Sequence, residues 1–88
     1  MSPEQCRAAR AWLGWSQQTL ADRANLGLST VKDFESGSRT PIANNLAAIH
    51  KTLADVGVEF LFDSNGAPDG IRVRQSSVRG TRRKGARR

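Results

Sequence analysis

The fold of this chain is decided by residues 16–37, which read SQQTLADRANLGLSTVKDFESG. Leu20 and Ala24 are spaced as neighbours on one helix face, and Val31 and Phe34 are spaced in the same way. Leu26 lies between the two pairs, where it would fill the corner. The pattern therefore predicts two short amphipathic helices joined by a tight turn. Their shared core would contain Leu20, Ala21, Ala24, Leu26, Val31 and Phe34.

The second of these helices, expected over residues 28–35, leaves a short ridge on its outer side. The ridge consists of Leu28, Ser29, Lys32 and Asp33. The major groove of double-stranded DNA admits a helix, and polar side chains on its outer face can reach the edges of the bases. The stretch therefore indicates a helix-turn-helix motif.

Helix signals flank this stretch on both sides. Ser2 and Pro3 predict a helix that runs to about Leu13, and Ser16 is a good cap for a helix over 17–24. Asn25 occupies the turn, where a positive φ is often required. A fourth helix is expected to start at Thr40-Pro41 and to end at Gly57. The large side chains of Trp12 and Trp15 are expected in the core.

After residue 57 the apolar period changes from helix to strand. Residues 58–62 and 71–74 alternate, and residues 63–70 are rich in turn formers, so 58–74 is predicted to be a β-hairpin. Residues 75–88 lack apolar periodicity and read as a disordered basic tail. The expected fold is mainly α, with four to five helices. Its three parts are a domain over 1–57, the hairpin over 58–74 and the tail over 75–88.

The whole net charge of +6 is located in the predicted tail. Residues 75–88 hold six basic residues and no acid, whereas residues 1–74 hold eight of each sign. No apolar run is long enough for a membrane span, so a cytoplasmic, nucleoid-associated location is expected. A single Cys6 and a distant His50 exclude a disulfide and do not make a zinc site. The chain also lacks tyrosine and a phosphate-binding glycine loop, so we expect neither an enzyme nor a cofactor or small-molecule ligand.

A known family shares several of these residues at the same spacing. Over about residues 5–56, the sequence resembles the Xre family of bacterial and phage regulators, which have the Cro and lambda-repressor type of helix-turn-helix. The matching segments are Leu13-Gly14-Trp15-Ser16-Gln17, Leu20-Ala21, Val31, Phe34-Glu35 and Gly37. Two positions depart from the family pattern: Asn25 stands for the turn glycine, and Gly27 stands for the usual serine or threonine cap.

The resemblance implies a set of DNA-contacting residues. Gln17 would touch a phosphate or brace the reading residues, and Leu28, Ser29, Lys32 and Asp33 would point at bases or phosphates. We expect backbone positioning from Gln17, Gln18, Thr30, Ser38 and Arg39. Ser29 and Lys32 would read bases, and Leu28 could touch a thymine methyl group. Asp33 would either accept a hydrogen bond from cytosine N4 or set specificity by repulsion.

These patterns predict a transcriptional regulator, most simply a repressor, that binds double-stranded DNA as a homodimer on an inverted repeat. The hairpin would form the dimer interface, by strand pairing or through its apolar face, and the outer surface of the fourth helix is the alternative. The apolar face holds Val58, Phe60, Phe62, Ile71 and Val73. A rival interpretation is a protein-binding module, such as an antitoxin or an antiactivator, which the neutral body and Asp33 keep open.

Overall fold

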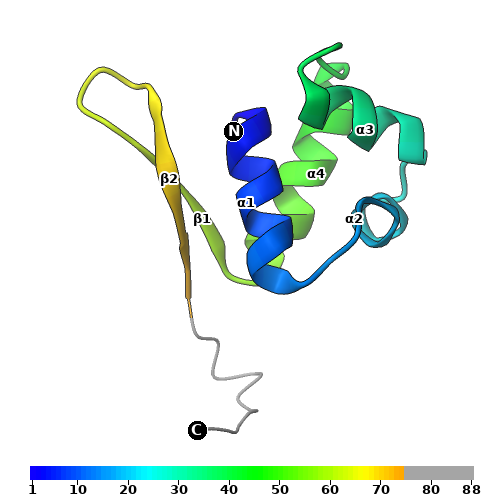
Figure 1. The fold of residues 1–88 in the computed structure, drawn as a ribbon, viewed down its shortest axis with the longest axis horizontal. Helices are drawn as coiled ribbons and strands as arrows, with labels where there is room; N and C mark the ends of the chain where they lie inside the picture. Colours follow the sequence, from blue (N-terminus) through cyan, green and yellow to red (C-terminus); the bar gives the residue numbers. More distant parts are fainter. Residues whose placement is uncertain (75–88) are drawn as a thin grey trace, which may run out of the picture.

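A computed structural model of the chain describes residues 1–74 as four helices followed by a two-stranded antiparallel sheet. In Figure 1, α2 and α3 lie on one side of α1, and the hairpin lies on the other side. The predicted tail, residues 75–88, lies outside the described residues. The elements are α1 (Pro3–Leu13), α2 (Gln17–Ala24), α3 (Leu28–Ser36), α4 (Ala43–Asp55), β1 (Val58–Phe62) and β2 (Pro68–Val73).

Local capping explains where the first helices begin and end. The Ser2 hydroxyl accepts a hydrogen bond from the Gln5 amide at 3.1 Å, and Ser16 caps α2 in the same way at Thr19. The turn between α2 and α3 places Asn25 in the left-handed region, at φ 61°. The predicted positive φ at Asn25 is therefore confirmed. Gly27 precedes α3 without a side-chain cap, as its lack of a side chain requires.

Several predicted boundaries differ from the structure, including the end of α4, which lies at Asp55 and not at Gly57. α3 runs one residue further, to Ser36. α4 starts at Ala43 rather than at Thr40-Pro41, because Ile42 has an extended backbone with ψ 158° and helical geometry begins only after it. β2 starts at Pro68 rather than at residue 71, because the turn closes over 63–67 through a hydrogen bond from the Asp63 amide to the Ala67 carbonyl.

The core lies where α1, α2, α3 and α4 meet and extends under the start of the hairpin. Its buried residues are Cys6, Ala9, Leu20, Ala21, Val31, Phe34, Ile49, Leu53 and Val58. Trp15 packs against this core, but the prediction for Trp12 is wrong, since its side chain is 66% exposed. Leu13 packs against the core in its place and extends the buried face of α1.

The hairpin turns its apolar side toward the helices. Val58 pairs with Val73 and Phe60 pairs with Ile71, and all four side chains lie in or against the core. At the base of the hairpin, Gly57 has a φ of 101°, and a Cβ there would lie 2.9 Å from the Arg74 carbonyl oxygen. The hairpin can close at this point only because residue 57 is a glycine.

A buried glutamine fastens the hairpin to α1. The Gln5 side chain donates from Nε2 to the carbonyl oxygens of Leu61, at 2.8 Å, and Gly70, at 2.9 Å. Its Oε1 accepts from the Ser2 amide at 2.8 Å. Gln5 is only 3% exposed, yet every one of these polar atoms has a partner. The angle between the hairpin and α1 therefore depends on this side chain.

Replacing Gln5 by alanine should loosen the hairpin. The change removes two hydrogen bonds between α1 and the hairpin and one half of the capping box, so we expect the free energy of unfolding to fall by about 2 kcal/mol. Urea unfolding measures this loss, and amide hydrogen exchange should rise first in residues 58–73. Ala8, which is exposed on the same helix, supplies the control as Ala8→Ser. Equal exchange in both variants would contradict the role of Gln5.

Candidate nucleic-acid interface

Helix α3 presents a polar face outward because its apolar residues are used in the core. Val31 and Phe34 are buried, whereas Ser29 and Lys32 are exposed and Asp33 is half-buried. Leu28, at the first turn, is also half-buried. The predicted ridge therefore exists as one surface of a helix that α2 holds from behind.

A hollow of about 240 Å³ lies between α3 and the start of α4. It brings together four of the predicted DNA-contacting residues, which are Ser29, Thr30, Asp33 and Arg39. Thr40, Pro41, Ile42 and Asn45 complete its lining. Sequence reasoning did not select Ile42 or Asn45, although Ile42 is 69% exposed beside this polar surface. Ile42 precedes α4 and Asn45 lies in its first turn, and the predicted helix start at Thr40-Pro41 gave no reason to assign either residue to this surface.

Glu35, on the inner side of α3, is the centre of a buried polar network. It is 2% exposed, and Arg10 of α1 donates to it from Nε at 2.7 Å and from Nη2 at 2.8 Å. Gln17 donates from Nε2 at 3.0 Å, and the Cys6 thiol donates at 3.2 Å. Arg10 also donates to the Trp15 carbonyl at 3.0 Å. One carboxylate thus ties α1, the following loop, α2 and α3 together.

The protonation states in this network follow from burial and from the neighbouring charges. Burial acts to raise the pKa of Glu35, but hydrogen bonds from Arg10, Gln17 and Cys6 and the charge of Arg10 outweigh it, so the pKa lies below the ordinary glutamate value. The hydrogen bond with Glu35 raises the pKa of Arg10. Burial, reinforced by Glu35, raises the pKa of the Cys6 thiol, which therefore stays protonated and can donate.

Sequence reasoning missed Arg10 and Glu35 as parts of this site. Gln17 was selected, and the network explains what its side chain does: the amide nitrogen must face Glu35, because a carboxylate only accepts hydrogen bonds. The same contact fixes the orientation of the whole Gln17 amide, including its oxygen and its second N–H. Gln17 is a bracing residue at the start of α2, held at a fixed place relative to α3.

The remaining predicted contacts lie at the edges of this surface. Gln18 is exposed but donates to Asp22 at 2.8 Å, so its amide is already engaged within α2. The Ser38 amide donates to the Asp33 carbonyl at 3.0 Å and closes the end of α3. The Arg39 amide donates to the same carbonyl at 3.3 Å, which leaves the exposed Arg39 guanidinium beside the hollow.

The predicted dimer residues lie on the opposite side of the molecule. Val58 is 3% exposed, and Phe60, Ile71 and Val73 pack against the protein's own core. His50 of α4 stacks near Phe60, with ring centroids 5.0 Å apart. Phe62 differs, because 48% of its side chain is exposed. This chain's own helices therefore bury Val58 and partly cover Phe60, Ile71 and Val73, whereas Phe62 is left exposed.

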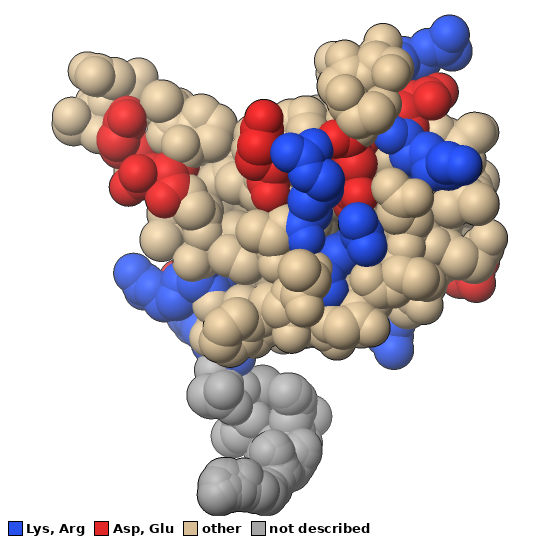
Figure 2. Space-filling model, viewed as in Figure 1, with Lys and Arg blue, Asp and Glu red and all other residues tan. Residues whose placement is uncertain are grey.

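The charge of the folded body is mixed rather than basic. In Figure 2, acidic and basic side chains lie close together over α1 and α3, and no broad basic patch covers this face. Eight basic and eight acidic residues lie within 1–74. Attraction to phosphates must therefore come from single positioned groups and not from the overall field of the domain.

The described residues hold neither a cluster of metal ligands nor a membrane-spanning helix. Within 1–74, no three acidic, histidine or cysteine side chains lie close enough together to hold a metal ion. None of the four helices there is long and apolar enough to cross a membrane.

Comparison with protein families gives one match. The model of the helix-turn-helix family aligns with residues 7–61, which include the whole of α2, α3 and α4. A search of curated proteins found no similar sequence.

The network predicts an acid-sensitive fold. Glu35→Gln leaves Arg10 without its charged partner in a buried place, and breaking such a pair costs about 3–5 kcal/mol. The folded-state pKa of Glu35 is lowered, so its contribution is complete above the unfolded value of about 4.3 and is lost as the pH falls through the folded value. Urea unfolding at neutral pH and near pH 3 measures the difference between wild type and variant, which should shrink in acid.

Glu59→Gln is the matched control, since Glu59 is a half-buried acid outside this network. It should destabilise the protein by less than about 1 kcal/mol at neutral pH. A Glu35→Gln variant that is no less stable than this control would contradict the central place of the network.

Proposed function

Because the chain belongs to the Cro/C1-type helix-turn-helix family of DNA-binding transcription regulators, we propose that it binds a specific double-stranded operator. It acts as a repressor, binds an inverted repeat as a dimer, and inserts α3 into the major groove. Repression requires only that the protein occupy its site on the DNA, which a small helix-turn-helix dimer achieves.

The polar outer face of α3 is the observation that carries this proposal. Lys32 and Ser29 are exposed on a helix whose opposite side is fixed by the core and by Glu35. Lys32 suits the O6 and N7 acceptors of guanine, and Ser29 can contact either kind of base edge. Leu28 can contact a thymine methyl group. Asp33 either accepts from cytosine N4 or excludes sites that bring a phosphate close to it.

Backbone contacts fix the register of α3 in the groove. Arg39 and Thr30 flank the hollow beside α3, where the exposed guanidinium of Arg39 can reach a phosphate. Ser38 and Gln18 border the same surface, and Gln17 holds α2 at the correct distance through Glu35. These contacts position the protein, whereas the α3 ridge selects the sequence.

One α3 helix covers only a few base pairs, so useful affinity requires a second copy about 34 Å away along the duplex. We assign the dimer contact to the hairpin. Since Val58, Phe60, Ile71 and Val73 face the chain's own helices, pairing of two hairpins side by side is favoured over contact through the apolar face.

A second candidate function is supported by one specific observation. Asp33 is partly exposed on α3 and forms no ion pair with any residue of 1–74, and the body as a whole is neutral. A carboxylate on this face suits a basic protein partner as well as a cytosine. The alternative is a protein-binding module of the antitoxin or antiactivator kind.

Lys32→Ala separates the two functions. If Lys32 reads a guanine, the variant should bind a DNA site selected from a random pool about 5- to 100-fold more weakly and should relax the preference at one base pair. Gel shifts at low salt measure both effects. Lys51→Ala is the matched control, because Lys51 is an exposed lysine on α4 that pairs with Asp55 and lies outside the predicted contacts.

A wild-type protein that selects no sequence and shifts no DNA at low salt would favour the protein-binding alternative. Equal losses in the lysine variants at positions 32 and 51 would show that charge alone, and not base reading, holds the DNA.

Residues 75–88 are expected to add affinity without specificity. Their six basic residues can neutralise at most six phosphates, which steepens the slope of log K against log salt by roughly five per subunit. Removing them should weaken the binding of all DNA sequences alike and leave the selected site unchanged. Fluorescence anisotropy titrations at several salt concentrations measure the slope. A changed preferred sequence would instead show that these residues read a groove.

A further inference from the structure

The hairpin carries opposite charges at its two ends. Asp63 and Asp69 are the only charged residues between positions 60 and 71, and both are exposed. We call this end, residues 62–69, the hairpin tip. At the other end, Arg72 and Arg74 share the single carboxylate of Glu59, at 3.2 Å and 2.5 Å, so one positive charge remains in excess. We call residues 57–59 and 72–74 the hairpin base.

The two ends are far enough apart to act separately. Asp69 and Arg72 are three residues apart along β2, which corresponds to about 10 Å at the usual rise of about 3.3 Å per residue, and Arg74 follows two residues later. This separation exceeds the Debye length of about 8 Å at physiological ionic strength, so an approaching molecule meets each end by itself. In Figure 2, the acidic side chains lie at the projecting end of the hairpin and basic side chains lie near its opposite end.

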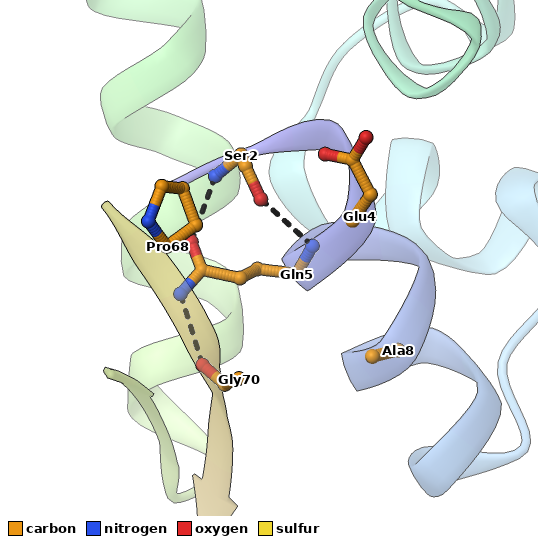
Figure 3. A pocket seen from close by; sticks show the side chains of 6 residues that line it. All are labelled: Ser2, Glu4, Gln5, Ala8, Pro68 and Gly70. Carbon is orange, nitrogen blue, oxygen red and sulfur yellow. Dashed lines mark hydrogen bonds between the residues drawn. The ribbon is translucent and has the colours of Figure 1, made fainter. Parts of the chain in front are cut away.

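The hairpin tip stands away from the helices. Between it and α1 lies a groove of about 420 Å³, lined by Ser2, Glu4, Gln5, Ala8, Pro68 and Gly70. Figure 3 shows Glu4 on α1 and Pro68 and Gly70 on β2 around this groove. Glu4 is exposed and adds a third carboxylate close to the tip. The groove keeps this end of the hairpin open to a partner.

The tip also offers apolar contact and an irregular edge. Phe62 is 48% exposed at the end of β1. A bulge between Leu61 and Phe62 leaves Asp69 without an opposite residue in β1, and the Asp69 side chain accepts no hydrogen bond from residues 1–74. Asp69 is therefore free to meet an outside cation.

We propose that the partner of this surface is a second copy of the chain, whose hairpin lies antiparallel beside the first. Asp63 and Asp69 at each tip then face Arg72 of the partner subunit and Arg74 of the partner subunit at its base. The inference rests on the dimer of the proposed function and specifies its geometry. Two-fold symmetry forms the contact twice, so the complementary charges meet at both ends.

Charge selects this arrangement over its alternative. If the two hairpins ran parallel, each acidic tip would face another acidic tip and each basic base would face another base, and both contacts would repel. In the antiparallel pair, each acidic tip lies beside the basic base of the other hairpin, so both contacts are attractive. The charges thus specify the relative direction of the two subunits, while Phe62 contributes apolar area.

Charge reversal at each end tests the proposal in the full chain without DNA. The tip variant carries Asp63→Asn with Asp69→Lys, where the asparagine oxygen still accepts from the amides of Asn65 and Ala67. The base variant carries Arg72→Gln with Arg74→Glu. Sedimentation equilibrium should show the dimer dissociation constant of each variant raised by about tenfold or more. An equimolar mixture of the two should associate about as tightly as wild type, because opposite ends again face each other.

The control changes net charge by the same amount elsewhere. Ala11→Lys with Asp22→Lys alters one exposed residue of α1 and one of α2, and should leave the dissociation constant within about twofold of wild type. Circular dichroism verifies that each variant is folded. The wild type alone gives a further test: raising the ionic strength from about 0.05 M to about 0.5 M should weaken its association by about tenfold.

Several outcomes would overturn the proposal. They are a wild type that stays monomeric at every concentration, variants that associate as tightly as wild type, a mixture that does not associate, or a salt-independent dimer. None of these depends on DNA. A wild type that forms the dimer but selects no DNA sequence therefore marks a failure of the proposed function separately from a failure of this geometry.

Discussion

The ion pair between Arg10 and Glu35 is the contact on which the rest of the structure depends. A carboxylate that is 2% exposed is costly unless its charge is paired and its oxygens are hydrogen-bonded. Arg10 supplies the charge, and Gln17 and Cys6 supply the further donors. These groups come from α1, α2 and α3. The hydrogen bonds that the buried Glu35 carboxylate requires therefore fix the relative positions of three helices.

This arrangement supports the DNA-binding surface that we propose for a domain whose net charge is neutral. The basic excess of the chain lies outside residues 1–74, so attraction alone would not distinguish one face of the body from another. A few polar groups on α3 and beside it must instead be held in place. Gln17 shows the coupling most directly, since its amide is bound to the same carboxylate that anchors α3. The fixed positions of these polar groups therefore compensate for the weak electrostatic field of the neutral domain.

Local signals in the sequence predicted the helix ends well, because each end depends on one or two residues. Ser2, Ser16 and Asn25 act within a few positions of themselves, and their roles were confirmed. The failures involve contacts between distant residues. In the sequence Glu35 is noted only as part of a segment that matches the family, because its role depends on Arg10, 25 positions earlier. The hairpin pattern likewise shows that one face is apolar, but not that the chain's own helices cover that face.

The covering of this apolar face changes what kind of dimer the hairpin can form. An interface made of Val58, Phe60, Ile71 and Val73 would have been largely hydrophobic and insensitive to salt. With Val58 in the core and the other three side chains packed against it, an interface at the hairpin consists mainly of strand edges, Phe62 and the charges at its two ends. Dimer formation would then weaken with salt together with DNA binding, because both rest on screened charges. Two linked equilibria that both weaken with salt make occupancy of a paired site respond more steeply than either equilibrium alone.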